Sequence, residues 1–154
     1  MLQADLLEKI SEANYLWADN YRVYRTIMRI FYLEHQKIHY QMDRDAVLLL
    51  LREQDLFAQY TPEQLTLDLQ QLVKWKNLTA IQDPRKPRTI AEFKNRQFQY
   101  MMSQAAIEIE RLTMTLENLS TRATGLSNSL FRRIREDLYK AEQLDTLPLR
   151  EVNA

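Results

Sequence analysis

The stretch TPEQLTLDLQQLVKWKNLTAIQ, residues 61–82, decides the fold. It opens with a strong helix start, because Thr61 can cap, Pro62 is tolerated at the first helical position, and Gln64 completes a capping box. Asn77 suits the left-handed residue that ends a helix, and residues 78–82 are short enough for a strand. The stretch therefore predicts a helix followed at once by a strand. The apolar positions of the helix are Leu65, Leu69, Leu72, Val73 and Trp75.

Upstream of this stretch, three apolar repeats predict further helices. One covers residues 2–17, a second follows a cap at Asp19 or Asn20, and a third follows a cap at Asp43. Residues 38–42 are short and alternating, which is typical of a small strand. The apolar positions of the three helices are Leu6, Ile10, Ala13 and Trp17; Tyr21, Tyr24, Ile27, Met28, Phe31 and His35; and Val47, Leu48, Leu50 and Leu51.

Downstream, residues 83–88 form a loop, and a second capping box at Thr89 and Glu92 predicts a helical turn or two over residues 90–95. Phe98, Tyr100 and Met102 then alternate with polar neighbours, as in a half-exposed strand.

After Ser103, a plausible cap, a long helix is expected. Its a/d seam consists of Met102, Ala105, Ile109, Leu112, Leu116 and Leu119. Residues 120–129 contain the only glycine, Gly125, and are interpreted as a hinge before a last helix. The apolar face of that helix carries Leu126 or Leu130, then Ile134, Leu138 and Ala141.

The predicted order of three helices and a two-stranded hairpin is that of a winged helix, in which the hairpin connection is the wing. The expected fold class is mainly α with a small β hairpin, a winged-helix core flanked by long helices. The expected organisation is an N-terminal helix over 1–18, a winged-helix domain over 19–102, a helical extension over 103–145 and a tail over 146–154. The abrupt finish suggests an N-terminal piece of a longer protein.

The composition excludes several classes of protein. Lys+Arg and Asp+Glu both number 21, so the chain lacks the basic excess that is usual for nucleic-acid-binding domains. It has no cysteine, hence no disulfide or thiolate metal site. The N-terminus does not read as a signal peptide, and no run approaches ~18 apolar residues. These features predict a cytoplasmic protein without a membrane segment.

Two kinds of binding site can be weighed from the residues. His35 and His39 lie four apart, but no glutamate base or cysteine completes a metal site, so no metal or other cofactor is expected. The helix after Pro62 carries acids and no arginine, which makes it a poor reader of DNA. The wing has basic residues suited to phosphate: Arg85, Lys86, Arg88, Lys94 and Arg96. A solvated loop explains that cluster equally well.

Catalytic constellations are absent, so the chain is not expected to be an enzyme. The apolar stripes over residues 6–17 and 102–119 exceed what a small three-helix core obviously covers. Such a surplus marks partner binding or self-association, although part of it packs internally. The predicted interface residues are Leu6, Ile10, Trp17, Ile109, Leu112 and Leu116.

Four segments carry a resemblance to a known family: YRVYRTIMRIFYLEHQ (21–36), YTPEQL (60–65), LVKWKNLTA (72–80) and TIAEFKNR (89–96). Together they resemble the N-terminal part of the JetA subunit family of bacterial Wadjet plasmid-defence systems. JetA is similar to MukF, the kleisin of bacterial condensins. The resemblance covers about residues 15–120.

The resemblance implies a non-catalytic kleisin domain of an SMC-type complex that extrudes DNA and restricts plasmids. The implied partners are a second copy in a homodimer, an SMC ATPase subunit and an accessory kleisin-binding subunit, with DNA reached mainly through the complex. A nucleoid- or plasmid-associated location in the cytoplasm would follow. The alternative is a winged-helix DNA-binding transcription regulator.

Overall fold

The structure is a computed structural model that describes residues 4–82 and 98–145. The chain forms two compact units, Met1–Leu112 and Thr113–Ala154. In chain order the elements are the 3-10 helices η1 (Ala4–Leu7) and η2 (Ser11–Leu16), α1 (Tyr21–Gln36), β1 (Met42–Asp43), α2 (Arg44–Arg52), the 3-10 helix η3 (Asp55–Phe57), α3 (Pro62–Lys74), β2 (Leu78–Gln82), β3 (Phe98–Met102) and α5 (Gln104–Asp145).

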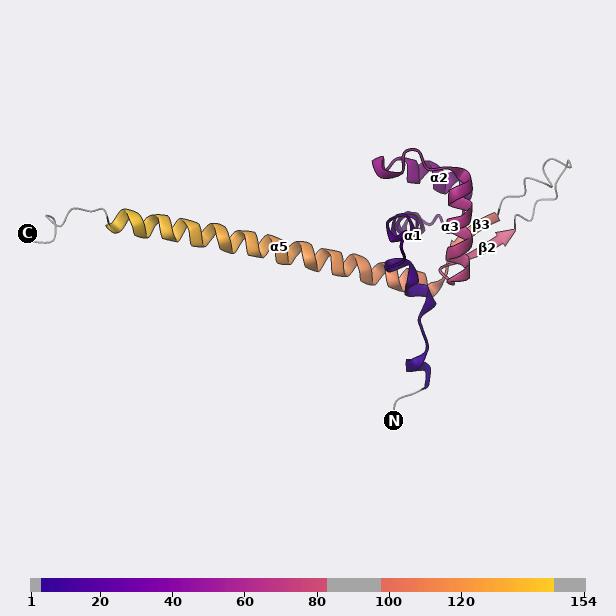
Figure 1. The fold of residues 1–154 in the computed structure, drawn as a ribbon, viewed down its shortest axis with the longest axis horizontal. Coiled ribbons are helices and arrows are strands. Elements are labelled where there is room, and N and C mark those ends of the chain that lie inside the picture. The colour runs from indigo at the N-terminus through magenta and orange to yellow at the C-terminus, as the bar shows by residue number, and fades with distance from the viewer. Residues whose placement is uncertain (1–3, 83–97, 146–154) are drawn as a thin grey trace, which may run out of the picture. The chain divides into compact units, whose positions relative to one another are not determined.

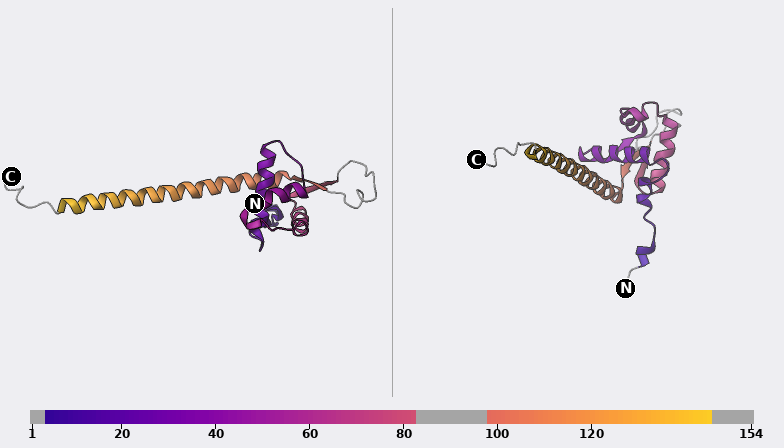
Figure 2. Two further views of the ribbon diagram at one scale, coloured as in Figure 1. Left: turned by 90° about the horizontal axis from the view of Figure 1, so that it is seen from above. Right: turned by 60° about the vertical axis from the view of Figure 1, so that its left-hand side comes forward.

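The first unit is built on three helices and a small antiparallel sheet (Figure 1). The strand order is β1-β3-β2, and Leu78 lies opposite Met102 in the β2–β3 hairpin. The element order from α1 to β3 is that of a winged helix, and the predicted mainly α class with a small β hairpin is confirmed. In the left view of Figure 2 the two strands of the hairpin extend away from the helices, and they pair antiparallel along their length.

Local hydrogen bonds explain where α2 and α3 begin. Thr61 Oγ1 accepts from the Gln64 amide at 3.2 Å, and Gln64 Oε1 accepts from the Thr61 amide at 3.2 Å, so the predicted capping box is confirmed. Asp43 Oδ1 accepts from the Ala46 amide at 2.8 Å, which confirms the other predicted cap. Each cap satisfies amides that the first helical turn leaves without partners.

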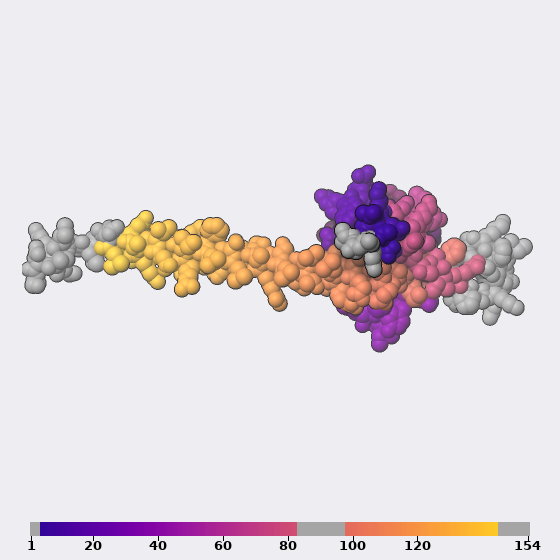
Figure 3. All heavy atoms as spheres, turned by 90° about the horizontal axis from the view of Figure 1, so that it is seen from below, coloured from indigo at the N-terminus to yellow at the C-terminus, as the bar shows by residue number. Residues whose placement is uncertain are grey.

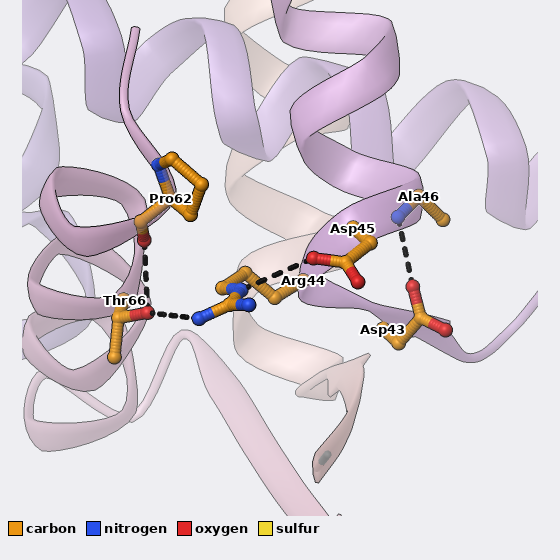
Figure 4. Close-up of polar contacts among 6 residues, drawn as sticks. All are labelled: Asp43, Arg44, Asp45, Ala46, Pro62 and Thr66. Carbon is orange, nitrogen blue, oxygen red and sulfur yellow. Dashed lines mark hydrogen bonds and ion pairs between the residues drawn. The ribbon is translucent and has the colours of Figure 1, made fainter. Parts of the chain in front are cut away.

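A polar contact joins the starts of these two helices (Figure 4). Arg44, the first residue of α2, donates from Nη1 to Thr66 Oγ1 on α3 at 3.2 Å. The Thr66 hydroxyl in turn donates to the Pro62 carbonyl at 2.9 Å, and Arg44 Nε lies 3.2 Å from Asp45 Oδ1. These hydrogen bonds link the first residue of α2 to the first two turns of α3.

The core of the first unit lies between α1, α2, α3 and the sheet. Leu65, Leu69 and Leu72 of α3 are fully buried, as the four-three spacing predicts. Tyr100 and Met102 of β3 are buried while Phe98 is exposed. The buried positions of α1 and α2 are Val23, Tyr24, Ile27, Met28, Phe31 and Tyr32, and Val47, Leu48 and Leu51.

The helix predicted over residues 2–17 is wrong. Two short 3-10 helices take its place, so Leu6, Ile10 and Trp17 do not form a stripe on one α-helical face. The residue that η2 buries is Tyr15, which is not part of the predicted apolar repeat. Bonds from distant elements hold this segment, as shown below for the tyrosine hydroxyl.

The ends of α1 and α3 differ in detail from the predictions. The left-handed residue after α3 is Lys76, with φ 63°, and not Asn77. Asn77 instead follows it, and its amide donates to the Leu72 carbonyl at 2.9 Å. After α1, Ile38 is left-handed with φ 70°, so of the strand predicted over residues 38–42 only Met42 is in β1. Asparagine tolerates the left-handed backbone better than most residues other than glycine, but α3 ends one residue earlier than predicted, so Lys76 adopts that backbone instead.

The long helix α5 runs without interruption from Gln104 to Asp145 (Figure 1). Its start is capped as predicted, since Ser103 Oγ accepts from the Ala106 amide at 3.2 Å. The hinge predicted over residues 120–129 is wrong, because Gly125 lies inside the helix. One glycine costs a helix only about 1 kcal/mol relative to alanine, which many neighbouring turns outweigh.

Candidate functional site

A buried ion pair lies in the first unit where η2, α1 and the start of α5 meet. Glu110 is fully buried; its Oε2 accepts from Arg29 Nε at 2.8 Å and its Oε1 accepts from the Tyr15 hydroxyl at 2.7 Å. Burial, followed by the Glu110 charge, raises the pKa of Tyr15 far above its ordinary value, so the phenol stays protonated and donates. The three side chains compensate one another's loss of hydration and are structural.

A second buried group holds the same N-terminal segment. The Asn77 side chain is fully buried and its Nδ2 donates to the Glu12 carbonyl at 2.7 Å, while the Asn77 carbonyl accepts from the Ser103 amide at 2.9 Å. Asn77 therefore joins η2 to the end of α3 and the start of α5. In Figure 3 the N-terminal segment, in indigo, lies on the surface of the first unit.

The predicted interface residues of the N-terminal segment lie outside η2: Leu6 is in η1, and Ile10 and Trp17 directly flank η2. Leu6, Ile10 and Trp17 are 67–70% exposed, although each is large and apolar. Ile109 is half-buried, and Leu112 is exposed. Leu116, the remaining predicted interface residue, belongs to the second unit and is exposed there. The exposure leaves these side chains available, while their role as an interface stays a prediction.

The first turns of α5 pack with a different face from the one that carries the predicted seam. Ala106, Ile107 and Glu110 are buried, whereas Ala105 and Leu112 of the seam are exposed. The packed face thus contains a charged residue, and the seam of leucines lies beside it. Hydrophobic periodicity found the seam but could not identify the packed face, because a buried glutamate counts against burial in any such pattern.

The second unit carries a row of exposed apolar residues along α5. At 3.6 residues per turn they fall on one side of the helix. All are between 54% and 67% exposed. We call this row the distal stripe; it consists of Leu116, Leu119, Leu126, Leu130, Ile134 and Leu138.

The helix that a DNA-binding winged helix lays in the major groove is α3. Of its predicted acids, Glu63 is exposed, but Asp68 is buried and accepts a hydrogen bond from the Tyr60 hydroxyl. Burial raises the pKa of the Asp68 carboxyl, against the opposing effect of the Tyr60 bond. The exposed positions include Leu67 and Lys74, and no arginine occurs in α3. This outer face offers little to base edges.

The remaining predicted residues do not form a site that the structure describes. The wing cations Arg85, Lys86, Arg88, Lys94 and Arg96 lie outside the described residues. His35 packs edge-on against Tyr40, with ring centroids 4.8 Å apart, whereas His39 Nδ1 lies 2.8 Å from Glu34 Oε2. The two imidazoles have separate partners, because α1 ends between them.

A shallow groove of about 360 Å³ lies between the end of α1, β1 and α2. Apolar side chains including Met42, Leu49 and Leu50 line it together with Glu34 and Asp43. Glu34 is engaged by Lys37 and His39, and Asp43 caps α2. The two carboxylates that line the groove are therefore already engaged within the fold. Among the described residues, no three histidine, cysteine or acidic side chains are placed to hold a metal ion.

Fold and surface together define a winged-helix protein whose described part carries exposed apolar side chains on its N-terminal segment and on α5. The chain belongs to the family described as "Protein of unknown function (DUF2397)", which matches residues 13–153. No match is found among curated proteins or among solved structures. Within residues 4–82 and 98–145, no helix has the length and apolar character needed to cross a membrane.

Proposed function

We propose that this chain is a non-catalytic kleisin domain of the JetA type, similar to MukF, in an SMC complex that extrudes DNA and restricts plasmids. In this proposal it acts by forming a homodimer and by docking an SMC ATPase and an accessory kleisin-binding subunit. ATP hydrolysis and DNA cleavage belong to other subunits, and DNA is reached through the complex.

One observation carries the proposal: a folded winged helix leaves large apolar side chains in solvent, and the outer face of its α3 suits DNA poorly. Leu6, Ile10 and Trp17 are exposed, and Ile10 and Trp17 directly flank η2, which Tyr15 and Asn77 hold in place. Large apolar side chains held in solvent gain no hydrophobic free energy until another surface covers them. Their exposure on an ordered segment therefore favours a protein partner.

The resemblance supports the kleisin assignment in particular. The segment over residues 21–36 coincides with α1, and the segments over 60–65 and 72–80 cover the start of α3, its end and most of β2. They thus fall on the elements that build the winged helix. The segment over 89–96 lies outside the described residues.

The test of dimerisation is the mass of the chain in solution, measured by light scattering over a concentration series. We expect a dimer at low micromolar concentration. The double variant Leu6→Asp/Trp17→Asp should be a monomer with unchanged helical circular dichroism. Leu56→Asp is the matched control, because Leu56 is 68% exposed but lies on η3. A wild-type monomer, or a dimer that survives the double variant, contradicts this use of the N-terminal residues.

Docking is tested by co-purification with an SMC ATPase subunit of a Wadjet system. Association that the Leu6→Asp/Trp17→Asp variant or an α5 variant removes supports the kleisin role. Tight duplex-DNA binding by the chain alone points instead to a transcription regulator, provided that binding weakens with salt and when Arg85, Lys86 and Arg88 are neutralised.

A further inference from the structure

The segment that precedes α1 is held to the first unit by few buried side chains. Of residues 11–17, Tyr15 alone is buried, whereas Ala13 and Leu16 are half-buried and Trp17 is exposed. Helix α1, by comparison, buries six side chains. Because burial of apolar surface is the main source of stability, a segment with one buried side chain opens more easily than its neighbours. We call residues 11–17 the strap.

Two polar anchors supplement this burial, and the first of them contributes little. Asn77 Nδ2 donates to the Glu12 carbonyl at 2.7 Å, but Asn77 Oδ1 is buried and has no hydrogen-bond partner in the part of the chain that the structure describes. An unsatisfied buried acceptor costs about as much free energy as one hydrogen bond contributes, or more. Release of the strap uncovers the Asn77 amide on the side of Glu12, so the docked state gains little from this anchor.

The second anchor joins the strap to the first turns of α5. The Tyr15 hydroxyl donates to Glu110 Oε1 at 2.7 Å, and Glu110 Oε2 accepts from Arg29 of α1 at 2.8 Å. A hydrogen bond to a charged group is stronger than a neutral one, so the Tyr15 bond supplies most of the polar hold on the strap. Because the bond from Arg29 does not involve the strap, Glu110 keeps a cationic partner when Tyr15 withdraws.

The backbone between the strap and α1 allows the two to separate. Residues 18–20 link them and belong to no helix. The start of α1 is satisfied locally, since the Tyr21 amide donates to the Ala18 carbonyl at 2.9 Å and the Val23 amide donates to the Asn20 carbonyl at 3.2 Å. These bonds do not involve either anchor, so α1 retains its first turn when the strap leaves.

We propose that the strap detaches from the first unit as one piece while the winged helix stays folded, and that its release loosens the first turns of α5. Docked, the strap holds those turns through Tyr15 and Glu110. Ile10 and Trp17 are exposed beside η2, so a protein that binds them and prefers one of the two states changes how firmly α5 is held. The inference goes beyond the proposed function and does not depend on the kleisin assignment.

Native-state hydrogen exchange of the full chain, followed by mass spectrometry over a series of low urea concentrations, tests the release. Amides of the strap should exchange about 100-fold faster than the slowest amides of α1 and α3. Their exchange should depend little on urea, because release exposes little surface, whereas the core amides should depend on it steeply. Strap amides that exchange at the rate of the core amides and with the same urea dependence overturn the proposal.

A pair of phenol variants tests the coupling to α5. Tyr15→Phe keeps the buried ring but removes the bond to Glu110, and it should speed exchange in the strap about tenfold. Exchange over residues 106–111 of α5 should rise several-fold, while α3 stays unchanged. Tyr60→Phe is the matched control, because it also removes a phenol bond to a buried carboxylate, that of Asp68 on α3. It should leave exchange in the strap and in α5 unchanged.

Two results of the Tyr15→Phe experiment contradict the proposal. If exchange in the strap rises while residues 106–111 are unaffected, the strap does not hold α5. If α3 accelerates by the same factor as the strap, Tyr15 supports the whole first unit and the strap does not release on its own.

The same measurement in the Leu6→Asp/Trp17→Asp variant separates this inference from the proposed dimer. A second copy bound to these residues would slow exchange of the wild-type strap relative to the variant, whereas a monomeric chain would show equal exchange in both. Local release in the variant supports the strap whether or not the wild-type chain dimerises. A variant whose strap opens only together with the core overturns the inference and leaves the dimer untouched.

Discussion

The two units of this chain treat similar residues in opposite ways. In the first unit the Arg29 guanidinium meets the buried Glu110 carboxylate, and Leu69 is fully enclosed. In the second unit Leu130 is 59% exposed, and Arg133 has no ion pair among the described residues. Both regions look alike as helical sequence, with leucines at helical spacing and charges between them. The difference teaches that amphipathicity marks a surface for burial without saying whether the same chain buries it.

The largest expected effect concerns the buried ion pair. Arg29→Ala removes the guanidinium that lies 2.8 Å from the buried Glu110 carboxylate, and we expect it to lower the free energy of unfolding by about 3–5 kcal/mol in urea denaturation. Glu110→Gln in the same chain should recover part of that loss. Arg133→Ala is the matched control and should change stability by less than about 0.5 kcal/mol. A small effect of Arg29→Ala would show that water reaches Glu110.

The second prediction compares two leucines. Leu69→Ala creates a cavity in the core of the first unit and should cost about 2–5 kcal/mol of unfolding free energy. Leu130→Ala, in the distal stripe, should cost less than about 0.5 kcal/mol for the isolated chain. Thermal and urea unfolding of both variants measure this contrast. A large cost at Leu130 would mean that the stripe is already covered, and would break the comparison between the two units.

The third prediction concerns Ile38, an exposed apolar residue whose backbone is left-handed. Ile38 is 72% exposed with φ 70°, a backbone that costs a residue with a Cβ about 1–2 kcal/mol. Ile38→Gly removes this backbone strain, but glycine also costs about 0.5–1 kcal/mol of extra backbone entropy on folding. We therefore expect the free energy of unfolding to rise by less than about 1 kcal/mol. Lys37→Gly, where φ is −87°, should destabilise. If Ile38→Gly lowers the melting temperature, the isoleucine side chain contributes a contact that exposure alone does not reveal.

The smallest effect is a dependence on pH. Because burial raises the pKa of Asp68, the folded chain binds its proton more tightly than the unfolded chain does. The contribution of Asp68 to stability is therefore greatest below the unfolded pKa of about 3.9 and declines as pH rises through the raised folded pKa. Asp68→Asn keeps an acceptor for Tyr60 without the charge, so its stability relative to wild type should increase between about pH 3 and pH 7. A difference that does not vary with pH would contradict the raised pKa.

The elements expected to carry the predicted interface were placed less accurately than those of the winged helix. The sequence identified Leu6, Ile10 and Trp17 as apolar, but placed them on one helical face that does not form. It identified the seam of α5, but missed that Glu110 belongs to the packed face. It divided α5 by a hinge that does not form, because Gly125 lies inside the helix.

Alone, the sequence determined the starts of α2 and α3, the bounds of β2 and β3, and the mainly α class. These depend on hydrogen bonds and side-chain periods within a few residues, such as the box between Thr61 and Gln64. Only the tertiary structure decided which apolar groups are buried and how the N-terminal segment is held. Tyr15 and Glu110 lie 95 residues apart in the sequence. No local sequence pattern can therefore show that the Tyr15 hydroxyl donates to the Glu110 carboxylate and stabilises its charge.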